Sequence, residues 1–184
     1  MKFEEAAWSQ DAQIRGEVVG DSLTVVNWVN GDWSAKGESF GEAVAALRRR
    51  VVEVFAGAAT PATNEASPLR HVFRELNQKA DRLAALGRGG LHKRVVSEQV
   101  WAWWQHRRLS KQGGHFRVWF DGSADGGAAG AGWWAEVKEQ GNGGRWWPIL
   151  AGCAPAEGDS QAAEVFACRR ALEEAAGLAI AHAI

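Results

Sequence analysis

Tyrosine is absent from this chain of 184 residues, and cysteine occurs only twice. Cys153 and Cys168 are too few for a disulfide framework, and they form no CxxC pattern of the kind that binds metal. The opening stretch, MKFEEAAWSQ, is polar and acidic and does not resemble a signal peptide. No apolar run reaches the length of a membrane span. We therefore expect a protein of a reducing, intracellular compartment, either the cytoplasm or the nucleus.

A large net charge is also missing, because 21 basic residues oppose 22 acidic ones and leave a formal charge of −1. The 46% of hydrophobic and 23% of charged residues are typical of a folded globular chain, here expected to be a single domain over residues 1–184. The charge is nevertheless uneven. Between residues 82 and 117 the only acidic residue is Glu98, and tryptophans 101, 103 and 104 lie among the cations. This stretch predicts either a solvated face or a nucleic-acid-binding face.

Hydrophobic periodicity predicts an α/β protein. Apolar residues at helical spacing predict long helices over residues 38–55 and 160–179, with shorter helices over 22–30, 77–87 and 97–111. Short runs of β-formers predict strands over residues 14–20, 69–73, 115–122, 132–140 and 145–153. The last three of these strands are expected to form a meander.

Four acidic residues lie where predicted strands end or where helices turn an apolar face inward: Asp21, Asp81, Asp121 and Glu164. Taken singly, each is also explained as a turn residue or a surface charge of a helix. Taken together, half-buried carboxylates repel one another, and a divalent metal ion is what makes such a group tolerable. Ligands that are all oxygen favour Mg²⁺ or Mn²⁺ over zinc. A pair of such ions is suited to in-line displacement at phosphorus.

Four segments of the sequence resemble the signature blocks of the ribonuclease H family, in its reverse-transcriptase-like, plant-type branch. They read HFRVWFDGSADGGAAGAGWW, DSQAAEVFACRRALEEA, EVVGDSLTVVNWVNG and HVFRELNQKADRLA. The last contains the Arg-Glu-x-Asn-x-x-Ala-Asp pattern of that branch. The resemblance implies a ribonuclease H-like fold, with a mixed five-stranded sheet flanked by helices.

The order of the blocks departs from the family, because the blocks with Asp21 and Asp81 precede those with Asp121 and Glu164. The chain therefore resembles a circularly permuted ribonuclease H. Residues 14–86 correspond to the family's C-terminal half and residues 116–182 to its N-terminal half, with a basic, Trp-rich connector over 87–115. Permutation is tolerated where the old termini lie close together at the surface. Two alternatives stay open: a dimer whose chains exchange halves, or a sequence that joins parts of two repeats artificially.

The resemblance also implies an activity, the metal-dependent hydrolysis of the RNA strand of RNA/DNA hybrids. Asp121 would be shared by two Mg²⁺ ions, with Mn²⁺ as a substitute. Asp81 would complete the site that activates water, and Glu164 and Asp21 would hold the second ion, near the leaving 3′ oxygen. A catalytically inactive hybrid- or RNA-binding module and a related nuclease acting on other nucleic acids are the alternatives. We expect a monomer, with a swapped dimer as the other possibility, and no membrane partner.

Two further groups of residues are candidate contacts to the substrate. The resemblance places Ser123 and Asn77 near the nucleic-acid backbone. The predicted connector helix adds basic and aromatic side chains that suit a duplex-binding face: Trp104, Arg107, Arg108 and Lys111. The alternative is that the tryptophans seal the helix onto the core. Both roles are compatible on one helix if Trp101 and Trp104 point inward and the three cations point outward.

Overall fold

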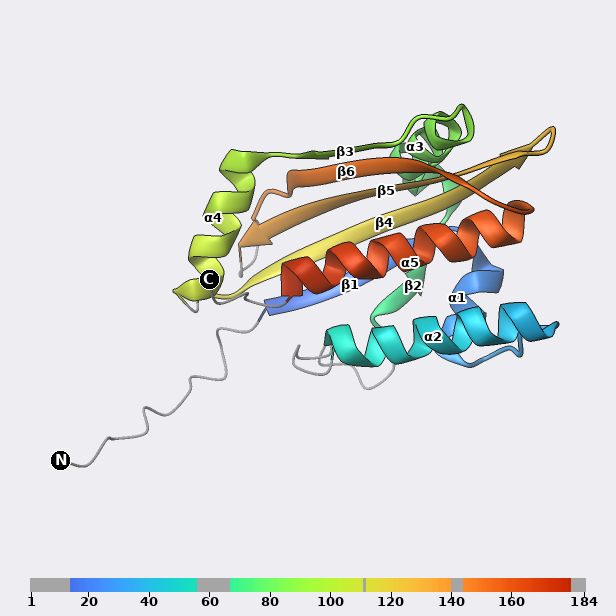
Figure 1. Cartoon of the computed structure of the whole chain (residues 1–184). Helices are drawn as coiled ribbons and strands as arrows, with labels where there is room; N and C mark the ends of the chain where they lie inside the picture. Colours follow the sequence, from blue (N-terminus) through green and yellow to red (C-terminus); the bar gives the residue numbers. More distant parts are fainter. Residues whose placement is uncertain (1–13, 56–66, 111, 140–143, 180–184) are drawn as a thin grey trace.

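The computed structural model of the chain describes residues 14–55, 67–110, 112–139 and 144–179. These residues form an α/β structure in which helices flank one mixed, open sheet of six strands (Figure 1). The strands are β1 (Ile14–Gly20), β2 (Leu69–His71), β3 (Lys93–Val96), β4 (Gly114–Asp125), β5 (Ala128–Glu139) and β6 (Trp147–Ala156). The helices are α1 (Leu23–Asn30), α2 (Glu38–Phe55), the 3₁₀ turn η1 (Arg74–Leu76), α3 (Gln78–Arg88), α4 (Glu98–Leu109) and α5 (Ser160–Ala179). The predicted α/β class, with a mixed sheet flanked by helices, is therefore confirmed.

The sheet has the strand order β2-β1-β4-β5-β6-β3. β1 lies parallel to both β2 and β4, whereas β4, β5, β6 and β3 pair in antiparallel fashion. The β4–β5 hairpin turns at Gly126 and Gly127, which have φ angles of 59° and 84°. A tight hairpin needs positive φ at both central positions, and glycine adopts it without steric cost. The sheet thus brings the front and the back of the sequence together at its centre, where β1 pairs with β4.

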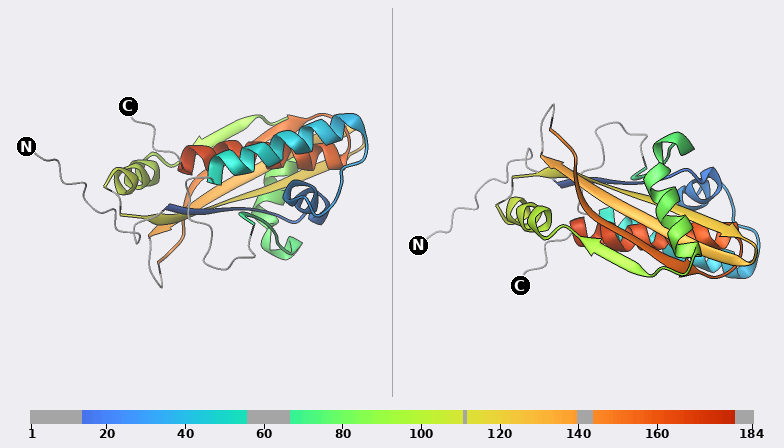
Figure 2. Two further views of the ribbon diagram at one scale, coloured as in Figure 1. Left: turned by 90° about the horizontal axis from the view of Figure 1, so that it is seen from below. Right: turned by 90° about the horizontal axis from the view of Figure 1, so that it is seen from above.

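The two faces of the sheet are covered differently. Helices α5 and α2 lie on one face and α3 lies on the other, as the two turned views show (Figure 2). Alternation along β4 sends Phe116, Val118 and Phe120 into the core beneath α5, where each is at most 1% exposed. The apolar stripe of α5 packs on these side chains, and its helical spacing is what identified the helix in the sequence.

None of the helices within the described ranges is long and apolar enough to cross a membrane.

Helix α3 approaches the sheet closely because β5 presents glycine to it. A Cβ added at Gly132 would overlap the backbone of Ala84, and one at Gly130 would overlap the backbone nitrogen of Arg88. The Gly-rich stretch of β5 is therefore a surface for helix packing. This close contact sets the distance between α3 and the sheet. It therefore also sets the positions of the α3 side chains that point toward the ends of the strands.

The expectation of five strands is wrong by one strand, which comes from the connector. β3 pairs antiparallel with β6, from Lys93 opposite Cys153 to Val96 opposite Leu150. Arg94 anchors it by donating two hydrogen bonds, of 2.7 and 2.8 Å, to the carboxylate of Glu174 in α5. The four residues of β3 are exposed or half-exposed, and two of them are basic, so they lack the apolar alternation that identifies a strand. Its pairing partner is distant in the sequence, so only the tertiary structure reveals it.

Candidate functional site

The strand register places Asp21 and Asp121 side by side. The parallel pairing of β1 and β4 ends with Gly20 opposite Phe120, so that each aspartate is the next residue along its own chain. β4 continues to Asp125, whereas the chain after Gly20 leaves the sheet and enters α1. Ser22 is the N-cap of α1 and accepts a long, 3.5 Å hydrogen bond from Val25. The cap role belongs to Ser22, and Asp21 is left facing the crevice between the diverging strands.

Glu164 reaches the same crevice from α5. A Cβ at position 122 would overlap the backbone of Ala163 and Glu164, so the glycine after Asp121 is what lets α5 lie against β4 here. One carboxylate oxygen from each of Asp21, Asp121 and Glu164 lies within 4.8 Å of the other two. The Oε2 atom of Glu164 is buried and has no hydrogen-bond partner among the described residues. Three oxygen ligands and an unsatisfied buried oxygen fit a divalent cation such as Mg²⁺ or Mn²⁺.

Asp81 lies on the wall of the same cavity, which has a volume of about 460 Å³, but outside the group of three oxygens. It belongs to the first turn of α3, and its Oδ1 accepts a hydrogen bond of 2.9 Å from Arg74. The Arg74 side chain is 77% exposed, so this ion pair is a weak, solvated one. Asp81, the fourth predicted ligand, thus lies near the other three carboxylates and forms an ion pair with Arg74.

Asn77 is buried next to Asp21 and has no exposed surface with which to contact a substrate. Its side chain is fully buried, and its Nδ2 donates to Asp21 Oδ1 at 2.9 Å and to the carbonyl of Phe120 at 2.8 Å. These two bonds join the start of α3 to β1 and β4 at the point where the strands diverge. The predicted role of Asn77 as a backbone contact is corrected to that of a residue that orients Asp21.

The electrostatics of the three carboxylates reflect their burial and proximity. Burial raises the pKa of Asp121 to about 9, with further contributions from a hydrogen bond to Asp21 and from the charge of Glu164. Burial likewise raises the pKa of Glu164 to about 8, and the charge of Asp21 adds to this effect. The cluster therefore retains protons near neutral pH when no cation is bound. A divalent cation would replace those protons, because it supplies the positive charge that the carboxylates lack.

Ser123, the predicted contact to the nucleic-acid backbone, lines the cavity, and it has a partner that the sequence did not single out. Its hydroxyl accepts a hydrogen bond of 2.9 Å from the guanidinium of Arg88, the last residue of α3. Arg88 follows Asp81 by seven residues, and two helical turns bring both side chains to one face of α3. That spacing is the signal that could have identified Arg88.

The connector residues lie away from this cavity. Trp104 points inward as predicted, whereas the expectation that Arg107 and Arg108 point outward is wrong. Trp104 is completely buried and donates from Nε1 to the carbonyl of Leu178 at 3.2 Å. Arg108 is only 7% exposed and donates to the carbonyl of Gly177, and burial lowers its pKa. Arg107, with a side chain 14% exposed, donates to the carbonyl of Gly113. Both arginines therefore bind backbone carbonyls, and Lys111 lies outside the described residues.

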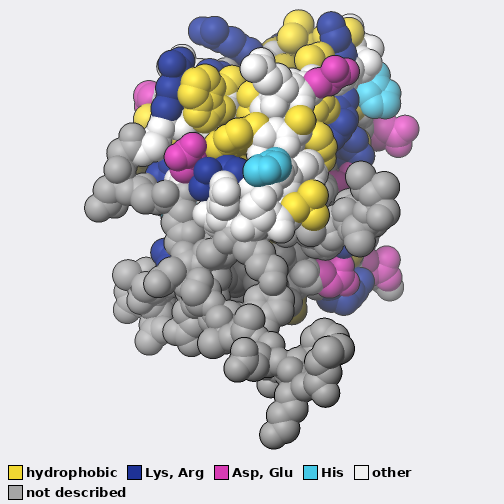
Figure 3. Space-filling view, turned by 90° about the vertical axis from the view of Figure 1, so that its left-hand side faces the viewer, with side chains coloured by type: hydrophobic (Ala, Val, Ile, Leu, Met, Phe, Trp, Pro, Cys, Tyr) yellow, Lys and Arg dark blue, Asp and Glu magenta, His cyan; other side chains and the backbone are white. Residues whose placement is uncertain are grey.

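Helix α4 is also remote from the carboxylates. It lies at the end of the sheet where β4 begins, whereas Asp121 and Glu164 lie toward the other end, where α5 begins (Figure 1). The surface at the α4 end mixes Lys and Arg with hydrophobic side chains (Figure 3). The tryptophans that were expected to seal this helix onto the core do so, through Trp104. The connector thus joins the two halves of the chain and closes one end of the core.

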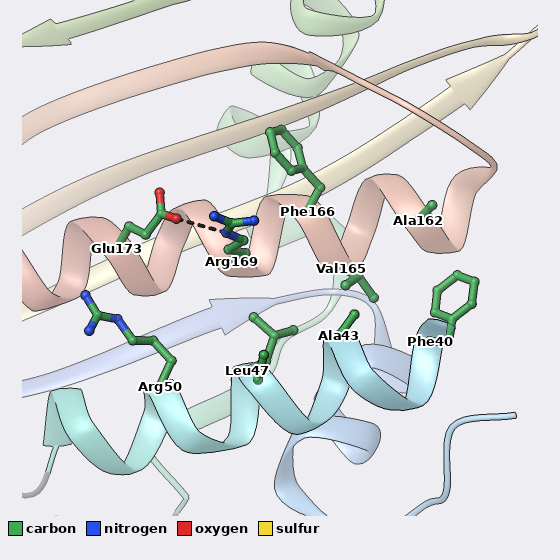
Figure 4. A pocket seen from close by; sticks show the side chains of 10 residues that line it. Phe40, Ala43, Leu47, Arg50, Ala162, Val165, Phe166, Arg169 and Glu173 are labelled. Atoms are coloured by element: carbon green, nitrogen blue, oxygen red, sulfur yellow. Dashed lines mark hydrogen bonds and ion pairs between the residues drawn. The ribbon is translucent and has the colours of Figure 1, made fainter. Parts of the chain in front are cut away.

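A larger cavity, of about 600 Å³, lies between α2 and α5 (Figure 4). Apolar side chains, among them Phe40, Leu47 and Phe166, make up most of its wall. Arg169 and Glu173 at its rim pair with each other at 3.0 Å. This groove offers hydrophobic surface and a single carboxylate. The polar cavity beside β4 is therefore the better candidate for chemistry.

No family model, no curated protein and no solved structure matches the chain.

Proposed function

We propose that this chain is a metal-dependent endoribonuclease that hydrolyses the RNA strand of RNA/DNA hybrids. The observation that carries the proposal is the convergence of Asp21, Asp121 and Glu164, whose oxygens lie within 4.8 Å of one another. These residues are far apart in the sequence, and each lies in one of the segments that carry the resemblance to ribonuclease H. Asp81, the fourth residue of that set, lines the same cavity.

The arrangement of the strands supports a circularly permuted ribonuclease H-like fold. When β3 is set aside, the remaining order is β2-β1-β4-β5-β6, with only β1 parallel to its two neighbours. If the chain is renumbered from β4, the first strand lies at the centre of these five, with two strands on either side of it. The helix that carries Glu164 lies on one face of the sheet, and the helix that carries Asp81 lies on the other. Residues 89–113 then join the ends that the unpermuted fold would leave free.

The chemistry of the site suits hydrolysis of a phosphodiester. Bound Mg²⁺ would supply an activated water and positive charge beside the phosphoryl and leaving oxygens, where negative charge develops. Asp21, Asp121 and Glu164 would hold the ions, and Asn77 keeps Asp21 turned toward them. Asp81 would join the ligands once Arg74 releases it, which costs little because the ion pair is exposed. An anionic substrate offers Arg74 an alternative partner at that moment.

Cleavage of matched duplexes tests the proposal. The full chain should cut the RNA strand of an RNA/DNA hybrid in the presence of Mg²⁺, and it should leave RNA/RNA and DNA/DNA duplexes of the same sequence intact. Asp121→Asn should lower the rate by about 100- to 1,000-fold, the effect of losing a central electrostatic group. Asp125→Asn is the matched control, because this aspartate lies on the same strand but is exposed at the hairpin.

Three outcomes are informative. Cleavage of the hybrid alone, abolished by Asp121→Asn and by EDTA, supports the proposal. Cleavage of other duplexes, with the same dependence on Asp121 and on metal, would support metal-dependent hydrolysis but assign a different substrate. No cleavage of any duplex, or equal rates for the two aspartate variants, would overturn the assignment as a nuclease.

A further inference from the structure

Arg88 is one of two arginines, with Arg74, in a cavity that is also lined by four carboxylates. It lines the same space as Asp21, Asp121 and Glu164, yet it forms no ion pair with any described carboxylate. Its one recorded side-chain hydrogen bond is to the neutral hydroxyl of Ser123. A guanidinium carries five N–H donors, so most of them remain available for an anionic ligand.

The sheet and α3 together hold this pair in place. Ser123 pairs across β4 and β5 with Gly130, and the missing Cβ of Gly130 lets the backbone of Arg88 lie directly above it. Asp121 pairs with Gly132 in the same ladder. Ser123 follows Asp121 by two residues, so both side chains lie on the same face of the sheet, about 6–7 Å apart along the strand. One step from phosphate to phosphate along a nucleic-acid strand covers a similar distance.

We propose that Arg88 and Ser123 form a phosphate-binding subsite. It holds the phosphodiester group next to the one that reacts at the carboxylates, and so sets the register of the strand. The inference rests on the proposed function, since it concerns the same nucleic-acid substrate. A guanidinium and a hydroxyl at hydrogen-bond distance present several donors to phosphate oxygens, a ligand that arginine binds in bidentate fashion. Arg74 is less suited to this role because its side chain is 77% exposed, whereas the hydrogen bond to Ser123 positions Arg88 beside the carboxylates.

Equilibrium binding of a labelled RNA/DNA hybrid in EDTA tests the subsite without cleavage. Arg88→Met removes the charge and keeps the length of the side chain. We expect it to weaken binding about 10-fold and to reduce the salt slope by about one phosphate contact. Arg82→Met is the matched control. It removes the same charge from the same helix, but Arg82 is exposed and lines a different cavity, so its binding should change less than about 2-fold.

Neutral phosphates locate the contact along the strand. In a series of hybrids, each carries one methylphosphonate at a different position of the RNA strand. For the wild-type chain, one position next to the cleaved bond should cost about as much affinity as Arg88→Met does. In the Arg88→Met variant that same replacement should cost nothing further, because the pair of changes removes a single interaction.

The outcomes separate this inference from the proposed function. If Arg88→Met and Arg82→Met bind equally, or if methylphosphonate costs add to the Arg88→Met cost at every position, the subsite does not exist. If the hybrid is bound with the expected Arg88 dependence but never cut with Mg²⁺, the subsite stands and the nuclease assignment falls. Should Arg88→Met melt at a lower temperature than wild type, Ser123→Ala repeats the cycle. Its loss of affinity should be smaller and at the same phosphate, and a loss elsewhere would overturn the proposal.

Discussion

The metal-free protein should lose stability as pH rises through neutrality, and Mg²⁺ should restore it. The pKa values of Asp121 and Glu164 are raised in the folded chain to about 9 and about 8, from ordinary values of 3.8 and 4.5. Between those limits the folded chain binds more protons than the unfolded chain. The free energy of unfolding therefore falls with increasing pH in this window, and the loss is complete above about pH 9.

The size of the effect follows from the number of retained protons. One extra proton on the folded chain lowers the free energy of unfolding by about 1.4 kcal/mol for each pH unit. From pH 5 to pH 7 one retained proton costs about 3 kcal/mol, and a second one doubles that loss. Total stabilities of domains are about 5–15 kcal/mol, so the metal-free chain should be distinctly less stable at pH 7 than at pH 5. Mg²⁺ at 100 times its dissociation constant should return about 2.7 kcal/mol.

Urea unfolding at pH 5, 6, 7 and 8, with EDTA or with Mg²⁺, measures both quantities. Asp121→Asn makes the test specific, because a neutral amide needs neither proton nor cation. Without metal, this variant should have the shallower pH profile and should be at least as stable as wild type at pH 7. It should gain little from Mg²⁺. Burial lowers the pKa of His115, which acts in the opposite direction, but it does so equally in both proteins.

Parallel pH profiles for wild type and Asp121→Asn would refute the reasoning, since the variant would then have removed no retained proton. Equal stabilisation of both proteins by Mg²⁺ would refute the assignment of the cation to these carboxylates. Asp125→Asn, at the exposed hairpin of the same strand, should follow the wild-type profile under both conditions.

Two further changes test how the structure is held together. Trp104→Ala should lower the free energy of unfolding in urea by about 3–5 kcal/mol, because this indole is fully buried. Trp33→Ala is the control, at a residue 47% exposed, and should change the free energy of unfolding by less than about 1 kcal/mol. Similar losses in the two variants would contradict the packing of α4 onto the core. Gly122→Ala should cost about 1–3 kcal/mol and abolish the thermal shift with Mg²⁺, because its Cβ would push α5 and Glu164 off β4. Gly41→Ala in α2, where nothing lies within 4 Å of an added Cβ, should be neutral or slightly stabilising and keep that shift.

Much of the fold was readable from local patterns. Alternation over residues 115–122 and helical spacing over residues 160–179 identified β4 and α5, because the apolar residues of each line a face that packs into the core. The sequence did not identify β3, because two of its four residues are charged, none is fully buried, and they show no apolar alternation. The carboxylates were recognisable because a Gly-Asp or Asp-Gly pair follows an apolar run at both Asp21 and Asp121.

By itself, the sequence determined which acidic residues are candidates for a metal site; the tertiary structure decided which of them meet. The pairing of Gly20 with Phe120 places Asp21 beside Asp121, although 100 positions separate them in the chain. Side-chain direction is likewise a property of packing, because a helix pattern does not say which of its polar residues find carbonyls to bind. Arg108 was therefore expected in solvent and lies buried at the end of α5, while Arg88, unremarkable in the sequence, stands beside the carboxylates. Contacts between elements distant in the chain set these positions, and no local pattern records them.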